Sequence, residues 1–231
     1  MLLTVKNLAK AYHTGGTRVE VLRDVSFCVE TAQSVALEGE SGSGKSTVLH
    51  LIAGLDAASG GNIVLDGTEL AGLSDKAAAA LRRSTVGVIF QQFNLMPSLT
   101  VRANIAFHAR LGGDFDAAWA DHLAERIGLE AHLGKYPEAL SGGQQQRVAI
   151  ARTLAARPKL ILADEPTGNL DEATADSVLT LMLESAHEAQ AAVLMVTHSP
   201  RQASRMSRRL TLSHGVVHED TPDTGQKAAP I

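Results

Sequence analysis

The stretch from Ser34 to Gly54 constrains this chain most, because it reads as a strand, a glycine loop and a helix in immediate succession. The apolar run 35–37 has strand length, and the apolar residues up to Ile52, followed by Gly54, are typical of a helix that ends at a glycine. Between them, residues 39–46 match G-x-x-x-x-G-K-[ST], in which glycines let successive backbone N–H groups converge on phosphate oxygens. The stretch therefore predicts a binding loop for a nucleoside triphosphate.

This phosphate loop, residues 39–47, supplies several kinds of contact. The helix that begins near Lys45 adds the positive end of its dipole to the converging N–H groups. The Lys45 ammonium is expected to contact the β and γ phosphates, and the Ser46 hydroxyl is the expected Mg²⁺ ligand. The residues of the loop expected to bind ATP are Gly39, Glu40, Ser41, Gly42, Ser43, Gly44, Lys45, Ser46 and Thr47.

Composition narrows the class of protein. The 231 residues, 45% of them hydrophobic, suffice for one large domain or one domain with an insertion, and the net charge of −4 does not point to nucleic acid. The single Cys28 excludes an internal disulfide, and the alternating run around it predicts a small core residue. No apolar run approaches the roughly 20 residues that cross a bilayer. We expect a cytosolic chain unless a partner anchors it.

Strand and helix patterns alternate along most of the chain. The stretches 2–5 and 19–29 predict a small antiparallel sheet. Residues 101–140 have no strand pattern and predict a helical insertion. The remaining strands are expected at 62–65, 85–90, 160–163 and 192–196, with a final hairpin over 210–217. Helices are expected at 76–83, 116–127 and 141–156 and after Asp171. This order predicts an α/β fold whose parallel strands present their chemistry at one edge. Residues 219–231 are polar and are expected to form a loose tail.

Asp164 and Glu165 follow the buried strand at 160–163. Asp164 is expected to hold Mg²⁺ through water, and Glu165 to orient and deprotonate the attacking water. Acidic residues often follow buried strands for structural reasons alone. The phosphate loop earlier in the chain favours the functional interpretation.

Ser141, Gly142 and Gly143 open a helix and form a second candidate anion site, since small residues expose the helix N–H groups. One nucleotide does not need two such loops in one chain. The segment is therefore either an ordinary polar helix start or part of a site completed on another molecule. Tyr12 poses a similar choice, because an aromatic platform for a base and a packing role are both open.

Leu140-Ser-Gly-Gly-Gln144 resembles the signature of the ATP-binding cassette (ABC) ATPases, a motif absent from ordinary P-loop kinases and GTPases. The resemblance covers residues 1 to about 218 and includes other motif residues in order: Tyr12, Gly39 to Ser46, Gln91, Asp164, Glu165, Gly168 to Asp171 and His198. It implies a P-loop NTPase fold with a RecA-like parallel-sheet core and an N-terminal antiparallel β subdomain. An α-helical signature subdomain would be inserted at about residues 92–155.

The resemblance also implies a role for each of these residues. Tyr12 would stack on adenine, Gln91 would contact Mg²⁺ and sense the nucleotide state, and His198 would lie near the γ-phosphate. Asp171 would belong to a loop between subunits. The signature residues Ser141, Gly142, Gly143 and Gln144 would close over the ATP of a second subunit. Glu165, His198 and Gln91 are thus the expected catalytic set, with Ser46, Gln91 and Asp164 at the metal.

The segments 165–171 and 90–95 resemble the subgroup that serves permeases of lipoprotein-release and macrolide-export type. Ser199 differs from the pattern of this subgroup, in which Asp usually follows the histidine that corresponds to His198. The difference bears on the position of the histidine and leaves ATP binding untouched. Four arginines at 201, 205, 208 and 209 read as a solvated face, with contact to a membrane surface as the lesser alternative.

The resulting expectation is an ATPase subunit that needs ATP and Mg²⁺, forms a homodimer around two ATP molecules and drives integral-membrane permease subunits. It would lie on the inner face of the membrane through that permease. One alternative is an ABC ATPase that transmits force to an envelope complex without transport. A less favoured alternative is one that acts on nucleic acid or ribosomes, because the chain has no long coiled coil, zinc cysteines or second cassette.

The loop 91–100 is apolar without a helical or strand period. Such a loop is a candidate docking surface, and in the resembled family this region receives a short cytoplasmic helix of the permease. We expect Leu95→Asp or Met96→Asp to weaken association with the partner while fold and nucleotide binding persist.

Overall fold

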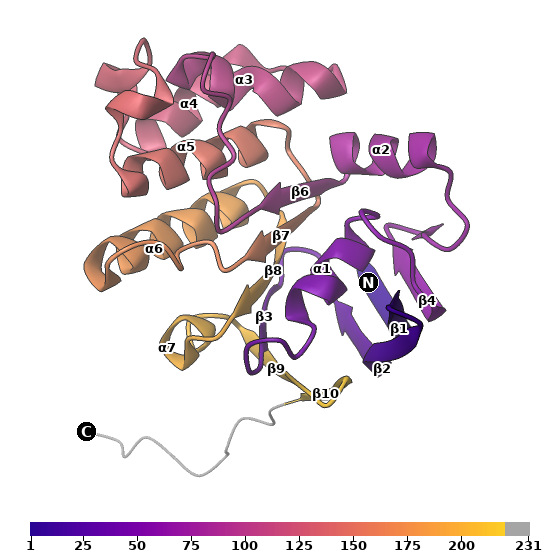
Figure 1. The fold of residues 1–231 in the computed structure, drawn as a ribbon. Helices are drawn as coiled ribbons and strands as arrows, with labels where there is room; N and C mark the ends of the chain where they lie inside the picture. Colours follow the sequence, from indigo (N-terminus) through magenta and orange to yellow (C-terminus); the bar gives the residue numbers. More distant parts are fainter. Residues whose placement is uncertain (220–231) are drawn as a thin grey trace, which may run out of the picture.

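Ten strands form one sheet in the computed structural model, which describes residues 1–219 (Figure 1). Their order across the sheet is β5-β4-β1-β2-β10-β9-β3-β8-β7-β6. The strands are β1 (Leu3–Thr14), β2 (Thr17–Val29), β3 (Ser34–Glu38), β4 (Gly60–Leu65), β5 (Thr68–Glu69), β6 (Val86–Ile89), β7 (Leu160–Asp164), β8 (Ala192–Thr197), β9 (Arg208–Ser213) and β10 (Val216–Glu219). The helices are α1 (Lys45–Ile52), α2 (Asp75–Ser84), α3 (Val101–Gly112), α4 (Ala117–Arg126), α5 (Gly142–Ala155), α6 (Glu172–Glu188) and α7 (Pro200–Ala203), with 3₁₀ turns η1 (Glu130–His132) and η2 (Pro137–Ala139).

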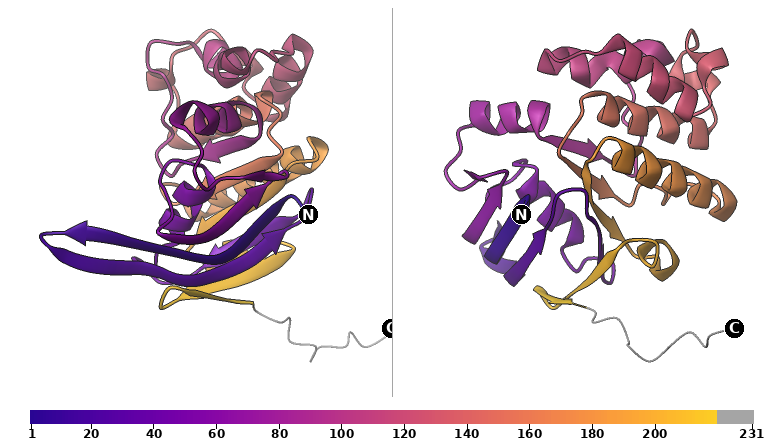
Figure 2. Two further views of the ribbon diagram at one scale, coloured as in Figure 1. Left: turned by 90° about the vertical axis from the view of Figure 1, so that its right-hand side faces the viewer. Right: turned by 180° about the vertical axis from the view of Figure 1, so that it is seen from behind.

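The sheet has a parallel and an antiparallel half, as predicted. Strands β9, β3, β8, β7 and β6 run parallel, while β1 pairs antiparallel with both β2 and β4. The expected first strand, 2–5, was too short, because β1 continues to Thr14 through register irregularities after Val5. Asn7 has a φ of 47° there, and a local irregularity of this kind interrupts the alternation that would have revealed the strand. Figure 2 shows β1 and β2 side by side, with their far ends extending beyond the rest of the fold.

The parallel strands bury side chains on both faces, which divides the core in two. One face contributes Val35, Leu37, Leu162 and Val196, among others, to a cluster with α1. Ala36, Ile161, Ala163 and Met195 alternate with them and join a cluster with α5 and α6. Because successive side chains of a strand point to opposite faces, α1 lies on one face of the sheet and α5 and α6 lie on the other.

The helical insertion predicted for residues 101–140 consists of α3, α4 and the two 3₁₀ turns, packed with α5 on the face away from α1 (Figure 1). Trp119 of α4 is nearly buried, and its Nε1 donates a hydrogen bond to the Leu154 carbonyl of α5 at 3.0 Å. A buried indole N–H that finds a partner fixes one helix against the next.

The prediction of a core position for Cys28 was wrong, because its side chain is only half-buried. Val25, Phe27 and Val29 are buried, and the two-residue period of β2 directs Cys28 to the opposite face.

The C-terminal hairpin is confirmed, since β10 pairs antiparallel with β9. It includes Glu219, one residue beyond the boundary expected at 218, and Glu219 accepts hydrogen bonds from Arg208 at 2.7 and 3.0 Å. The rest of the expected tail, residues 220–231, lies outside the described residues. Within residues 1–219, no helix combines the length and the apolarity needed to cross a membrane.

Candidate active site

The phosphate loop connects β3 to α1 at the carboxyl end of the parallel strands. A Cβ atom at Gly39 would lie 2.5 Å from the Leu212 carbonyl oxygen, and one at Gly44 would lie 2.9 Å from side-chain carbons of Leu22 and Val21. Gly44 caps α1 in the left-handed conformation with a φ of 102°. Only glycine fits such positions, so the glycines of the motif are needed to fold the loop as well as to approach a phosphate.

Lys45 is 6% exposed and lies inside the loop. Its Nζ donates hydrogen bonds to the carbonyl oxygens of Gly39 (2.8 Å) and Glu40 (2.7 Å). The ammonium thus holds the loop in a curved shape around the start of α1. A phosphate bound there would meet the same positive charge and the N–H groups of the first helical turn.

The structure brings Ser46, in the first turn of α1, against Asp164, at the end of β7. The Ser46 Oγ donates a hydrogen bond to Asp164 Oδ1 at 3.0 Å. Burial raises the pKa of Asp164 above its ordinary value, and the hydrogen bond from Ser46 opposes that shift. A divalent cation would stabilise the ionised carboxylate, and this pair of oxygen ligands suits Mg²⁺. Among the described residues no group of three or more His, Cys, Asp or Glu side chains could hold a metal. Besides Ser46, Asp164 and the predicted ligand Gln91, oxygen atoms of phosphate and water would complete the coordination of Mg²⁺.

Glu165 and His198 meet at the next position along this edge. His198 Nδ1 lies 3.0 Å from Glu165 Oε1, and the two residues follow the neighbouring strands β7 and β8. Glu165 has a φ of 45°, and its N–H donates to the Val196 carbonyl, which directs the chain sharply away from the strand. An uncommon backbone conformation at a side chain of this kind is frequent in active sites.

Gln91 pairs with Asn169 through two hydrogen bonds, a contact that the sequence did not reveal. Its Nε2 donates to Asn169 Oδ1 at 3.2 Å, and Asn169 Nδ2 donates to the Gln91 carbonyl at 3.0 Å. A Cβ atom at Gly168 would lie 2.9 Å from Gln91 Nε2 and 3.3 Å from Glu165 Oε2, so glycine lets these side chains converge. Asn169 was noticed only as part of a motif, because its partner lies 78 positions earlier in the chain.

The signature segment begins α5 with reciprocal hydrogen bonds. Ser141 Oγ accepts from the Gln144 N–H at 3.3 Å, and Gln144 Oε1 accepts from the Ser141 N–H at 2.9 Å, which is a capping box. A Cβ atom at Gly143 would lie 2.5 Å from Thr174 Cγ2 of α6, whereas one at Gly142 would be in ordinary contact with Phe93 and Leu170. α1 and α5 lie on opposite faces of the sheet. The atoms nearest to a Cβ at the two signature glycines belong to Phe93, Leu170 and Thr174.

Asp171 and Tyr12 each make a local contact of their own. Asp171 caps α6 by accepting a hydrogen bond from the Thr174 N–H at 3.0 Å, and bonds to Thr174 lower the pKa of its carboxyl. Tyr12 is 38% exposed near the end of β1, and its hydroxyl donates to Asp56 Oδ2 at 2.8 Å. Burial, followed by this bond to Asp56, raises the pKa of the Tyr12 phenol. Asp56 had no role in the sequence-based predictions.

The arginine-rich segment after His198 is more than a solvated face. Arg201 forms ion pairs with Glu172 and Asp176 of α6, and Arg205 Nη2 donates to Thr180 Oγ1 at 2.6 Å. These contacts fasten α7 and the residues that follow it to α6. Ser199 caps α7 by accepting from the Gln202 N–H, a position that serine and aspartate both suit, so the departure at 199 retains the cap.

A family model described as ABC transporter matches residues 22–168. Over 229 residues the chain is 42% identical to the lipoprotein-releasing system ATP-binding protein LolD of Shewanella oneidensis, which covers 98% of this chain and 99% of that protein. It is also 42% identical to the macrolide export ATP-binding/permease protein MacB of Neisseria gonorrhoeae over 223 residues, 95% of this chain and 34% of that longer protein.

Solved structures share the whole architecture. A dimeric post-hydrolysis state of the ATP-binding cassette MJ0796 bound to ADP and Pi superposes with a TM-score of 0.84 at 34% identity, covering 94% of this chain and 98% of that chain. A second dimeric structure of MJ0796, described as a bacterial ABC transporter cassette, gives a TM-score of 0.85 at 35% identity, over 94% and 97% of the two chains. The expected P-loop NTPase fold is confirmed by these neighbours.

Proposed function

The chain belongs to the ABC transporter family, and on this premise we propose that it closes with a second copy of itself around two ATP molecules to drive a membrane permease. It is the ATP-hydrolysing subunit of a system of lipoprotein-release or efflux type, the two activities that its relatives' names describe. The partner is one or more integral-membrane permease subunits. Through them the chain would associate with the inner face of the membrane.

The observation that carries the proposal is that two candidate anion-binding segments begin helices on opposite faces of the sheet. The phosphate loop opens α1 on one face of the sheet, and the signature segment opens α5 on the other. Two chains related by a two-fold axis would place the phosphate loop of one chain opposite the signature segment of the other, and would enclose an ATP at each of the two contacts. The dimeric state of the MJ0796 structures agrees with this arrangement.

Each residue at the edge of the sheet then has a task in hydrolysis. Mg²⁺, when bound with ATP, would neutralise charge on the phosphates, with Ser46 and Asp164 holding it. Glu165 would accept a proton from the attacking water, and His198, 3.0 Å from Glu165, would restrict the carboxylate's orientation and reach the γ-phosphate. Gln91, paired with Asn169, would report the state of the phosphates to the loop that follows it.

The loop that follows Gln91 borders a groove suited to the permease. The groove has a volume of about 570 Å³ and is lined largely by apolar side chains, including Phe90, Met96, Phe107 and Leu111. Met96 is 39% exposed and Leu111 is 58% exposed. An amphipathic helix with two or three apolar anchors would bury these side chains, which is the usual way in which a helix docks in a groove.

Buried polar contacts hold this loop in place without a partner. Asn104 is fully buried; its Oδ1 accepts from the Met96 N–H at 2.8 Å, and its Nδ2 donates to the Leu99 carbonyl at 2.9 Å. Arg152 donates to the carbonyls of Asn94 (2.6 Å) and Phe93 (3.1 Å). Leu95, in contrast to Met96, is partly buried and packs against the core of α5 and α6. Leu95→Asp is therefore expected to disturb the fold, and Met96→Asp is the cleaner test.

The test is purification of the tagged chain from detergent-solubilised membranes of its host, with identification of the proteins that accompany it. Wild type should retain an integral-membrane permease, and Met96→Asp should lose it while binding ATP with unchanged affinity. Tyr136→Asp is the matched control, since it adds the same charge to a side chain that is 48% exposed and outside the groove.

Retention of the permease by Met96→Asp would remove the groove from the proposal. Recovery of ribosomes or nucleic acid in place of a membrane protein would overturn the proposed partner. ATP hydrolysis that drives no movement of cargo in vesicles containing the permease would favour a force-transmitting complex.

A further inference from the structure

We propose that Asp56 is a positioning residue for the base of the nucleotide, because it fixes both the ring of Tyr12 and the ammonium group that covers one face of that ring. The inference rests on the proposed function in one respect, namely that Tyr12 stacks on adenine. It adds two residues, Asp56 and Lys10, that hold the Tyr12 ring in place before ATP binds.

Strand geometry brings Lys10 and Tyr12 to the same side of β1. They are two residues apart, and side chains at that spacing share a face of a strand. The Lys10 Nζ lies 4.6 Å from the centroid of the Tyr12 ring, within the range of a cation–π contact. Lys10 therefore occupies one face of the ring, while the 38% exposed fraction of Tyr12 leaves ring surface open to solvent.

A single carboxylate holds both side chains. Asp56 Oδ1 accepts from Lys10 Nζ at 2.7 Å, and Asp56 Oδ2 accepts from the Tyr12 hydroxyl at 2.8 Å. Lys10 is 8% exposed, and its Nζ also donates to the Ala57 carbonyl at 2.7 Å. Partial burial acts to raise the pKa of Asp56, but the hydrogen bonds from Lys10, Tyr12 and Ala57 outweigh it and the pKa lies below its ordinary value. The carboxylate is consequently ionised at neutral pH and keeps both contacts.

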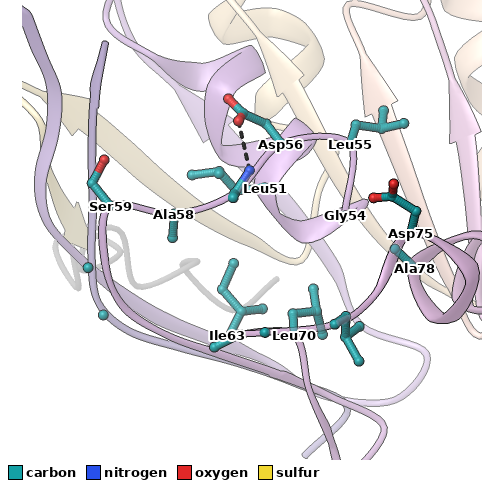
Figure 3. Close-up of a pocket in the computed structure, with 16 residues that line it drawn as sticks. Leu51, Gly54, Leu55, Asp56, Ala58, Ser59, Ile63, Leu70, Asp75 and Ala78 are labelled. Atoms are coloured by element: carbon teal, nitrogen blue, oxygen red, sulfur yellow. Dashed lines mark hydrogen bonds between the residues drawn. The ribbon is translucent and has the colours of Figure 1, made fainter. Parts of the chain in front are cut away.

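The turn that carries Asp56 is itself anchored to β1 and α2. The Ser59 N–H donates to the Ala9 carbonyl at 2.9 Å, and the Ala11 N–H donates to Ser59 Oγ at 3.0 Å. Arg82 of α2 donates to the Gly54 carbonyl at 2.7 Å. Figure 3 shows Asp56 bonded to a backbone N–H, with its carboxylate pointing away from Ile63 and Leu70 across the cavity behind the turn.

This anchoring links the two ends of the nucleotide site. The phosphate loop opens α1, and the turn with Asp56 follows the end of the same helix. The distance from the phosphates to the base platform is thus set by a rigid helix and a short pinned turn. A ring held in one orientation loses less entropy when a base stacks on it, and this pre-organisation raises affinity. The Lys10 charge polarises the ring and favours stacking of an electron-rich purine on the free face.

The experiment compares ATP with inorganic tripolyphosphate, which has the phosphates and no base, by calorimetry in the presence of Mg²⁺. Asp56→Asn removes the charge that holds Lys10 and keeps the size of the side chain. We expect it to weaken ATP binding by about threefold to tenfold and to leave tripolyphosphate binding unchanged. Tyr12→Phe, which retains the ring and the Lys10 contact, should show a smaller loss.

The double variant Tyr12→Ala with Asp56→Asn separates positioning from a general effect on stability. It should bind ATP no more weakly than Tyr12→Ala alone, since without the ring Asp56 has nothing to position. The inference is overturned if Asp56→Asn binds ATP like wild type, if it weakens tripolyphosphate equally, or if its loss adds in full to that of Tyr12→Ala. Normal ATP affinity of Tyr12→Ala would instead remove base stacking from the proposed function, and this inference with it.

Discussion

Adjacent glycines of the signature segment should respond differently to the same substitution. Gly143→Ala would bring a Cβ atom to 2.5 Å from Thr174 Cγ2, at the contact between α5 and α6. Gly142→Ala would bring one to 3.5 Å from Phe93 Cζ and 3.6 Å from Leu170 Cδ2, which is ordinary van der Waals contact. The pair therefore separates the packing role of the segment from its proposed contact with ATP.

The size of the effect follows from that distance. Carbon atoms in contact stay about 3.5 to 4.0 Å apart, so the helices must separate by roughly 1 Å or Thr174 must leave its rotamer. Overpacking of this kind costs about 1 to 3 kcal/mol, and alanine returns up to about 1 kcal/mol of helix propensity. We expect Gly143→Ala to lower the free energy of unfolding by about 1 to 2 kcal/mol. Gly142→Ala should leave it unchanged or raise it slightly.

Urea unfolding followed by far-ultraviolet circular dichroism measures this difference. Thr174→Ser in the Gly143→Ala background removes the Cγ2 methyl group and should restore most of the lost stability, because the Thr174 N–H that bonds Asp171 is retained. ATP-dependent dimerisation should be impaired by Gly142→Ala at unchanged stability. Equal stabilities of the two alanine variants, or no recovery with Thr174→Ser, would refute the packing of α5 on α6 described above.

Three further predictions concern charge at the site and beside the groove. Glu165→Gln should retain ATP affinity, nearly abolish turnover and accumulate an ATP-bound dimer on size exclusion; unimpaired multiple-turnover hydrolysis would contradict its role as the base. Lys45→Ala should weaken ATP binding by roughly 1.5 to 3 kcal/mol, the usual range for charge-assisted contacts, and equal affinities by calorimetry would reject the phosphate loop. Burial and the charge of Arg152 lower the pKa of His108 to about 4. His108 thus stays neutral in the folded state while the unfolded chain gains a proton below about pH 6.5, so stability is fully present above that pH and falls toward pH 4. Because solvent screens this half-buried group, the free energy of unfolding should fall by on the order of 1 kcal/mol between those pH values. In urea titrations His108→Gln should lack this decrease. The same dependence of unfolding free energy on pH in wild type and His108→Gln would contradict the assignment to His108.

Local patterns in the sequence determined the parts of the fold that depend on neighbouring residues. The phosphate loop, the buried strand before Asp164 and the caps at Ser74 and Asp171 are short-range features, because glycine geometry, alternation and capping act within a few positions. Strand β1 was underestimated for the same reason, since an irregular register hides its alternation. Family resemblance, carried by the order of the motifs, supplied the expected roles of Gln91 and His198.

Tertiary structure alone decided which of these features meet. Ser46 and Asp164 are 118 positions apart in the sequence, and Tyr12 and Asp56 are 44 positions apart. No local sequence pattern could therefore predict either contact. Met96 lines the groove and Leu95 packs against the core, a difference that the sequence could not show because a loop without a period does not indicate which side chain faces inward. The placement of the phosphate loop and the signature segment on helices of opposite faces has the same origin. It depends on which face of the sheet each helix covers, and that is settled by long-range packing of alternate side chains into two cores.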